Sequence, residues 1–115
     1  MTTDTLRDAE PLSAAELQEI EQFTDVLWME RGLSKNTLAA YRNDLAGLAV
    51  WLARQGRLLL TARRQDLLAY LSERVAAGAR PRTTARLVSS MRRFYRYLVR
   101  EGRLQDDPSV RIDTP

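Results

Sequence analysis

Arginine side chains recur along one face of the stretch from Arg80 to Gly102, at the spacing of an α-helix. At about 100° per residue, the following residues fall within roughly 40° of Arg82 on the helical wheel: Arg86, Ser89, Arg93, Arg96 and Arg100. The planar guanidinium group pairs bidentately with phosphate and with O6 and N7 of guanine. No acidic residue lies on this face before Glu101, so the sequence shows nothing that offsets the repulsion between like charges. The stretch therefore predicts a surface for a polyanion, and DNA is the obvious candidate.

Three other interpretations of this face stay open. With 17 arginines and one lysine in the chain, it can be the solvated surface of an arginine-rich protein. It can also belong to a helical protein–protein interaction module that docks an acidic partner. The third is a helix-turn-helix repressor, but that fold requires a short turn before its recognition helix and usually a dimer interface, and the sequence indicates neither. Salt-dependent DNA binding distinguishes a DNA-binding face from a docking face.

The sequence lacks the residues on which common catalytic and metal sites depend. It contains no histidine and no cysteine, which excludes histidine-based triads, zinc sites and disulfides. The tyrosines have no histidine or carboxylate partner nearby in sequence, and we interpret all four as core or rim residues: Tyr41, Tyr70, Tyr95 and Tyr97. Tyr97, between Arg96 and Arg100, is also a candidate for stacking on a base. We expect no catalytic residue, no metal ion and no cofactor.

Charge is distributed unevenly along the 115 residues, a length that corresponds to one domain. Residues 1–30 carry eight acids and one base, a net charge of −7, whereas residues 31–115 carry 17 bases and seven acids, a net charge of +10; together these give the +3 of the whole chain. This asymmetry predicts one nucleic-acid face and one face turned away from it. The chain has no long apolar run and its acidic N-terminus is unlike a secretory signal, so we expect a cytoplasmic protein.

Apolar residues at helical spacing predict an all-α fold of four helices, arranged as two helical hairpins. We expect these helices over residues 13–31, 35–55, 61–77 and 83–102. Ser13 and Glu16 form a capping box at the first helix, and Gly32 ends it. Ser34 and Thr61 are the expected N-caps of the second and third helices.

The same periodicity predicts which residues form the core. We expect five residues to be buried where the hairpins cross: Leu45, Leu71, Leu87, Phe94 and Leu98. Trp28 and Trp51 each border an apolar face and are also expected in the core. The opposite face of the second helix carries small or amide side chains, namely Asn36, Ala40, Asn43 and Gly47. These either form a plain polar face or allow another surface to approach closely.

Three segments of the chain carry recognisable motifs. The first holds ERGLSKNTL at residues 30–38 and YRNDL at 41–45, the second holds Trp51, Leu52 and Gly56, and the third holds RLVS at 86–89 and RRFYRYL at 92–98, with Asp107-Pro108 after it. Taken together, they resemble the N-terminal core-binding, SAM-like domain of bacterial tyrosine recombinases, with the Xer pair and the XerD type closest. The similarity covers residues from about 18 to 115.

The resemblance implies a domain of crossed hairpins that forms half of a clamp around a recombination half-site of double-stranded DNA, with the second and fourth helices in the major groove. Together with the helical wheels it gives the expected DNA-binding residues: Lys35, Asn36, Thr37, Ala40, Asn43, Arg82, Thr83, Arg86, Ser89, Ser90, Arg93, Arg96 and Arg100. The other implied partners are recombinase protomers, both XerC-like and further copies of itself, against which the first helix packs. No membrane contact is expected, and the fragment alone is expected to be monomeric.

The catalytic residues of such recombinases lie in a C-terminal domain that the resemblance does not reach. We expect residues 1–12 to be a disordered tail, 13–106 the DNA-binding domain and 107–115 the start of a linker to a catalytic domain absent from this chain. The chain is then a non-catalytic, DNA-binding part of a site-specific recombinase. The resemblance implies that the whole enzyme acts in DNA integration and chromosome dimer resolution.

Overall fold

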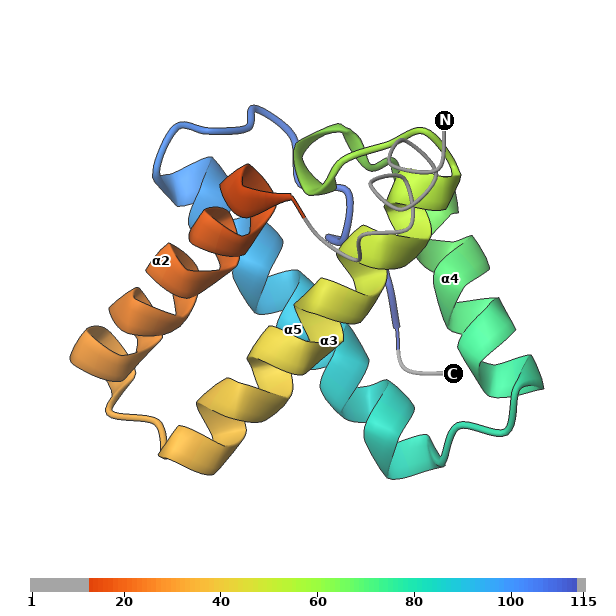
Figure 1. Cartoon of the computed structure of the whole chain (residues 1–115), viewed down its shortest axis with the longest axis horizontal. Helices are drawn as coiled ribbons and strands as arrows, with labels where there is room; N and C mark the ends of the chain where they lie inside the picture. Colours follow the sequence, from red (N-terminus) through yellow and green to blue (C-terminus); the bar gives the residue numbers. More distant parts are fainter. Residues whose placement is uncertain (1–12, 114–115) are drawn as a thin grey trace, which may run out of the picture.

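Four α-helices and one 3-10 turn make up the computed structural model, which describes residues 13–113 (Figure 1). In chain order they are α2 (Ala14–Arg31), α3 (Lys35–Arg54), η1 (Leu59–Thr61), α4 (Arg64–Ala76) and α5 (Pro81–Arg100). No strand occurs in the described range, and the predicted all-α fold is confirmed. The tail expected at residues 1–12 lies outside that range. None of the described helices is long and apolar enough to cross a membrane.

The helices form two hairpins that pack across each other. α2 and α3 make the first hairpin, α4 and α5 make the second, and α3 crosses in front of α5 in the view of Figure 1. Both of these helices begin at the lower edge of that view and diverge above their crossing. The crossing therefore brings the N-terminal ends of α3 and α5 to the same side of the molecule.

Side-chain caps determine where the first two helices begin. The Ser13 hydroxyl accepts a hydrogen bond from Glu16 N at 3.2 Å, and the Ser34 hydroxyl accepts one from Thr37 N at 3.1 Å. Gly32 follows α2 with φ at +60°, a conformation that favours glycine, and its N–H donates back into the last turn of the helix. These two N-caps and the glycine stop agree with the sequence prediction.

The carboxylate of Glu16 does not close the predicted capping box. It is buried and accepts a hydrogen bond from Leu59 N at 2.7 Å, while the hydroxyl of buried Tyr95 donates to Leu59 O at 2.8 Å. Both polar groups of the Leu59 backbone are thus satisfied inside the protein, as buried backbone requires. A capping box is a local pattern, whereas this contact joins residues 43 positions apart, so the prediction was wrong for a tertiary reason.

The third and fourth helices begin at residues other than those predicted. Thr61 does not cap α4, because it lies within η1. α4 begins after Arg63, whose N–H donates to the Asp66 carboxylate at 2.8 Å; side-chain hydrogen bonds from the Arg63 guanidinium to the same carboxylate lower the pKa of Asp66. α5 begins at Pro81, because proline fits the first position of a helix, where its missing N–H is not needed.

The hairpin crossing buries an apolar core. All five residues predicted for it are at most 4% exposed: Leu45, Leu71, Leu87, Phe94 and Leu98. Phe23 of α2 packs edge-on against Phe94, with ring centroids 5.3 Å apart, so the first helix joins the same core. The four tyrosines are also buried, which confirms their interpretation as core or rim residues.

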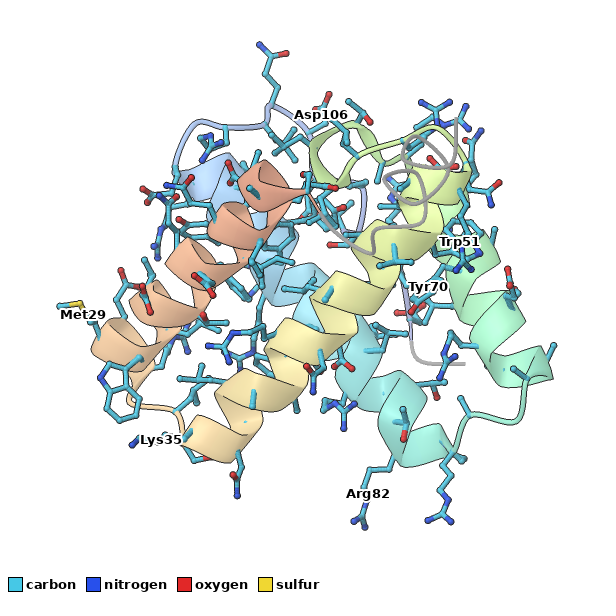
Figure 2. The ribbon with its side chains drawn as sticks, viewed as in Figure 1. Met29, Lys35, Trp51, Tyr70, Arg82 and Asp106 are labelled. Atoms are coloured by element: carbon cyan, nitrogen blue, oxygen red, sulfur yellow. The ribbon has the colours of Figure 1, made fainter. Side chains whose placement is uncertain are left out.

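Of the two tryptophans predicted for the core, Trp51 packs against its edge and Trp28 does not. Trp28 is 50% exposed near the end of α2, beside Met29, which points away from the domain in Figure 2. Trp51 is half-buried against Tyr70, and its Nε1 donates to Glu73 at 2.6 Å. A wheel shows that a side chain borders an apolar face, but only tertiary packing decides whether a neighbouring helix covers it.

The small-residue face of α3 divides into two parts. At Gly47, an added Cβ would lie 3.0 Å from the hydroxyl oxygen of Tyr70, so glycine allows α4 to approach α3 closely. Nearer the start of the helix, Asn36 and Asn43 are exposed to solvent. The close-approach interpretation therefore holds for one end of this face, and the other end is free for a ligand.

After α5 the chain packs back onto the domain. Ile112 is 1% exposed within the core and Ser109 is fully buried. Asp107 Oδ1 accepts hydrogen bonds from Ser109 N at 2.8 Å and from Ser109 Oγ at 2.6 Å, which fixes the turn before this segment. The part of the predicted linker up to Ile112 is thus in contact with the domain, and the domain boundaries stay a prediction.

Truncating Leu98 to alanine is expected to lower the free energy of unfolding by about 2–5 kcal/mol, because the side chain is fully buried and its removal leaves a cavity. Urea denaturation followed by circular dichroism measures the change. Val110, 63% exposed, is a matched control whose truncation should leave the midpoint nearly unchanged. Equal midpoints for wild type and Leu98→Ala would show that the register of α5 is wrong.

Candidate nucleic-acid interface

Most predicted DNA-binding residues lie on the side of the molecule where α3 and α5 begin. Figure 2 shows Lys35 and Arg82 at this lower edge, one from the start of each helix. The exposed members of the predicted set are Lys35, Asn36, Asn43, Arg82, Ser89, Arg96 and Arg100. The half-buried members are Thr37, Ala40, Thr83, Arg86 and Arg93.

Ser90 is the predicted site residue that the fold removes from this surface. It is fully buried, and its hydroxyl donates to Asp44 Oδ2 at 2.7 Å, while Arg86 O, 3.0 Å away, is the alternative acceptor for the same hydrogen. On the helical wheel Ser90 lies beside the arginine face, which is why it was predicted to be on the surface. The wheel does not show which side of α5 is covered by α3, and Ser90 lies on that covered side. Ser90 therefore supports the surface from within and does not form part of it.

Arg86 has an acidic partner, which corrects the expectation that nothing offsets the charges of this face. Its Nε and Nη2 donate to the two carboxylate oxygens of Asp44 at 2.9 and 2.8 Å. These hydrogen bonds raise the pKa of the Arg86 guanidinium above its ordinary value. The partner lies 42 positions earlier in the sequence, on α3, so a search along α5 alone could not find it.

Arg100 is also paired, at the far end of the arginine face. Its guanidinium donates to both carboxylate oxygens of Glu30 on α2, at 2.9 and 3.2 Å, and lies 3.4 Å from Glu101. The hydrogen bonds that Arg100 donates to Glu30 raise the pKa of its guanidinium. Both side chains are about half exposed, so water screens this pair, unlike the one at Arg86.

Two arginines that the sequence prediction missed join the remaining ones. Arg31, at the end of α2, and Arg92, on α5, line an open concavity together with Ser89, Arg93 and Arg96. No carboxylate lines this arginine concavity, and none of its four arginines forms an ion pair within residues 13–113. Arg92 falls outside the 40° sector of the wheel and Arg31 is on another helix, so only the packing of α2 beside α5 shows the cluster.

Neither tyrosine near the arginines is available for chemistry or for stacking. Tyr97 is 9% exposed, and its ring packs against Phe23 with centroids 5.5 Å apart, so it is not the base-stacking residue that the sequence suggested. Tyr95 is fully buried, and desolvation raises the pKa of its hydroxyl far above the ordinary value. Within the described residues, no cluster of carboxylates could hold a metal ion.

We define the interface surface as the exposed and half-buried residues of the predicted set other than Arg100, together with Arg31 and Arg92 of the arginine concavity. They are Arg31, Lys35, Asn36, Thr37, Ala40, Asn43, Arg82, Thr83, Arg86, Ser89, Arg92, Arg93 and Arg96. Their chemistry is that of cationic forks, amides and hydroxyls, which can bind phosphate oxygens and base edges. They include no acidic side chain.

Comparison with known proteins gives a family match and close relatives. Residues 20–102 match the family described as phage integrase, N-terminal SAM-like domain. The tyrosine recombinase XerD of Yersinia pestis is 48% identical over 96 residues, which are 84% of this chain and 32% of that protein. The XerD of Proteus mirabilis is 49% identical over 96 residues, again 84% of this chain, and 31% of that protein.

A third relative shows a similar extent of match. The XerD of Pseudomonas aeruginosa is 41% identical over 104 residues, which are 90% of this chain and 35% of the relative. The chain thus spans about a third of the length of the curated relatives it matches. The resemblance that the sequence motifs indicated is confirmed.

The two ion pairs of the arginine face should differ in their effect on stability. Replacing Arg86 with alanine leaves the Asp44 carboxylate, which is 8% exposed, without its charged partner, so we expect a loss of about 1–3 kcal/mol in the free energy of unfolding. Replacing Arg100, whose pair is half exposed, should leave the denaturation midpoint unchanged. Thermal melts of the two variants test this, and equal melting temperatures would contradict it.

Proposed function

The chain belongs to the phage integrase N-terminal SAM-like domain family, and on that premise we propose that it binds double-stranded DNA through the interface surface. The observation that carries the proposal is the arginine concavity, where four guanidinium groups lie together with no carboxylate in the lining. Outside the interface surface, Arg57 and Arg63 pair with Asp66 and Arg103 pairs with Glu19, while six arginines there form no ion pair within residues 13–113: Arg42, Arg54, Arg64, Arg74, Arg80 and Arg111. On the interface surface, Arg86 alone of the arginines in residues 13–113 has such a partner.

Unmatched cations on one face are costly in an isolated protein, because like charges repel one another. A duplex offers two rows of phosphates, and neutralising them releases condensed counterions. The arginine concavity fits a phosphate group well, since four guanidinium groups and the Ser89 hydroxyl line one hollow with no competing carboxylate. We assign it to the DNA backbone, where it fixes position and not sequence.

The start of α5 is the proposed base-contacting end. Arg82 and Arg93 are separated by 11 residues, or about 16 Å along a helix at 1.5 Å per residue. The major groove is about 12 Å wide and admits one helix. A helix that enters the groove with Arg82 can therefore place the arginine concavity against a phosphate strand at the rim.

The start of α3 supplies amide side chains to the same groove. Asn36 and Asn43 are exposed, and an asparagine amide can pair bidentately with N6 and N7 of adenine. Ala40 lies between them and is small enough to allow a close approach of the helix to the bases. Lys35 stands at the helix start, where it can reach a phosphate.

We further propose that the chain is the DNA-gripping part of a tyrosine recombinase of the XerD type. The relatives carry that name, and about two thirds of their length lies outside the matching segment. In this proposal DNA cleavage and rejoining belong to a part of the enzyme outside this chain, and recombinase protomers assemble on adjacent half-sites. The roles in DNA integration and chromosome dimer resolution belong to that larger enzyme.

Replacing Arg92 or Arg96 with alanine should weaken DNA binding by a similar factor for all sequences. Each lost phosphate contact should flatten the slope of log K against log salt by about 0.9. Fluorescence anisotropy of a labelled duplex at several salt concentrations measures both quantities, and we expect wild-type dissociation constants of about 10⁻⁴–10⁻⁶ M. Arg54→Ala is the matched control, because this exposed arginine lies at the other end of α3, about 28 Å along the helix from Lys35.

A slope that stays the same in Arg92→Ala and Arg96→Ala would contradict the backbone assignment. Poly-glutamate, tested in parallel as a ligand, addresses the alternative of a docking face for an acidic protein. Tighter binding to poly-glutamate than to duplex DNA at equal salt would favour that alternative and refute the proposed function.

A further inference from the structure

Asp44 holds Arg86 in one orientation at the hairpin crossing. Its Oδ1 accepts from Arg86 Nη2 at 2.8 Å, and its Oδ2 accepts from Arg86 Nε at 2.9 Å and from Ser90 Oγ at 2.7 Å. The carboxylate is 8% exposed and comes from α3, whereas Arg86 and Ser90 come from α5. Three hydrogen bonds from two side chains thus fix the acid, and the acid fixes one edge of the guanidinium.

The opposite edge of the Arg86 guanidinium faces solvent. Of its five N–H donors, the one on Nε and one on Nη2 are used by Asp44. Nη1 has no hydrogen-bond partner within residues 13–113, and the buried unpartnered atoms there are Glu19 Oε2 and Arg42 Nε alone. Nη1 is therefore in contact with water, in a side chain that is 40% exposed.

This outer edge lies on the interface surface, one helical turn after Arg82 on the same face of α5. It carries parallel N–H groups on Nη1 and Nη2, the arrangement that pairs with two acceptors side by side. Guanine presents such acceptors, O6 and N7, in the major groove. An arginine free to rotate would lose conformational freedom on binding, whereas one already held loses less.

We propose that Asp44, supported by Ser90, is a positioning residue that presents the outer edge of Arg86 to a guanine in the major groove. The proposal rests on the proposed function and adds to it a base identity and a residue that never touches DNA. It also explains why an acid stands next to a DNA-binding face. An ion pair whose acid is only 8% exposed gains little stability over apolar packing, so a role in orientation accounts for it better.

A second acid that pairs with the arginine face, Glu30, provides the contrast. Glu30 meets Arg100 with both side chains about half exposed and with no third group to hold the acid. Substituting Glu30 or Asp44 with the corresponding amide changes the net charge equally, by +1. Glu30→Gln is therefore a matched control for the electrostatic effect of Asp44→Asn.

The experiment begins with wild-type protein and a library of duplexes with a randomised central segment, from which the preferred sequence is selected. Affinities for that duplex, and for the duplex in which each guanine in turn is replaced, give a specificity ratio for each guanine position. We expect Asp44→Asn to lower the ratio at one guanine by about 5- to 150-fold while binding to other sequences is retained. Glu30→Gln should strengthen binding to all duplexes and leave every ratio unchanged.

Two further variants separate positioning from a general structural role. Arg86→Lys keeps the charge but lacks the planar guanidinium with its paired N–H donors. It should therefore lower the specificity ratio at the same guanine position as Asp44→Asn. In an Arg86→Ala background, Asp44→Asn should cause no additional loss, because the acid acts through the arginine. Circular dichroism melts identify the temperature range in which each variant is folded, and binding is measured within it.

The outcomes distinguish this inference from the function on which it rests. If wild-type protein shows no salt-dependent binding to any duplex, the proposed function fails. If wild type binds but selects no guanine, or if folded Asp44→Asn keeps every ratio, the positioning role is wrong and DNA binding stands. An equal effect of Asp44→Asn with and without Arg86 would also refute it.

Discussion

Where α3 crosses α5, apolar and charged contacts lie next to each other. Leu45 and Leu87 are buried in the common core, while Asp44 and Arg86, their immediate sequence neighbours, pair at its edge. The angle and depth of this crossing determine which side chains of the two helices remain exposed. The starts of both helices reach the same side of the molecule because the hairpins meet here. The cations of the interface surface depend on that geometry, since they come from three different helices, α2, α3 and α5.

Two acids of α2 act as counter-charges for arginines outside the interface surface. Glu30 of α2 pairs with Arg100, the last residue of α5, and Glu19 of α2 pairs with Arg103, just after that helix. The acidic N-terminal part of the sequence therefore neutralises the end of the arginine face that lies farthest from the helix start. The arginines of the concavity, on α5 and at the end of α2, keep their charges unmatched within residues 13–113.

Periodicity was sufficient for the helices and the core, because burial of Leu45, Phe94 and Leu98 follows from spacing alone. Caps made by a neighbouring side chain, such as Ser13 and Ser34, were also predictable. Contacts between distant segments were not: Glu16 with Leu59 and Asp44 with Arg86 are more than 40 residues apart. Errors at Trp28 and Ser90 have the same cause, since a wheel describes one helix and not what lies against it. Most of the candidate site was predicted, and the ion pairs and the arginine concavity required the tertiary structure.

The burial of Ile112 has a mechanical consequence. The chain leaves α5 at Arg100, makes the turn at Asp107 and then inserts Ile112 into the core, so this segment is an anchor and not a loose tether. A force applied to the backbone beyond Asp113 therefore acts on the packed helices through the Ile112 side chain. The residues between α5 and Ile112 cannot extend under such a force while Ile112 stays in the core. Any rotation of a segment attached there would be centred beside α4, where Asp113 lines one hollow together with Leu68 and Val75.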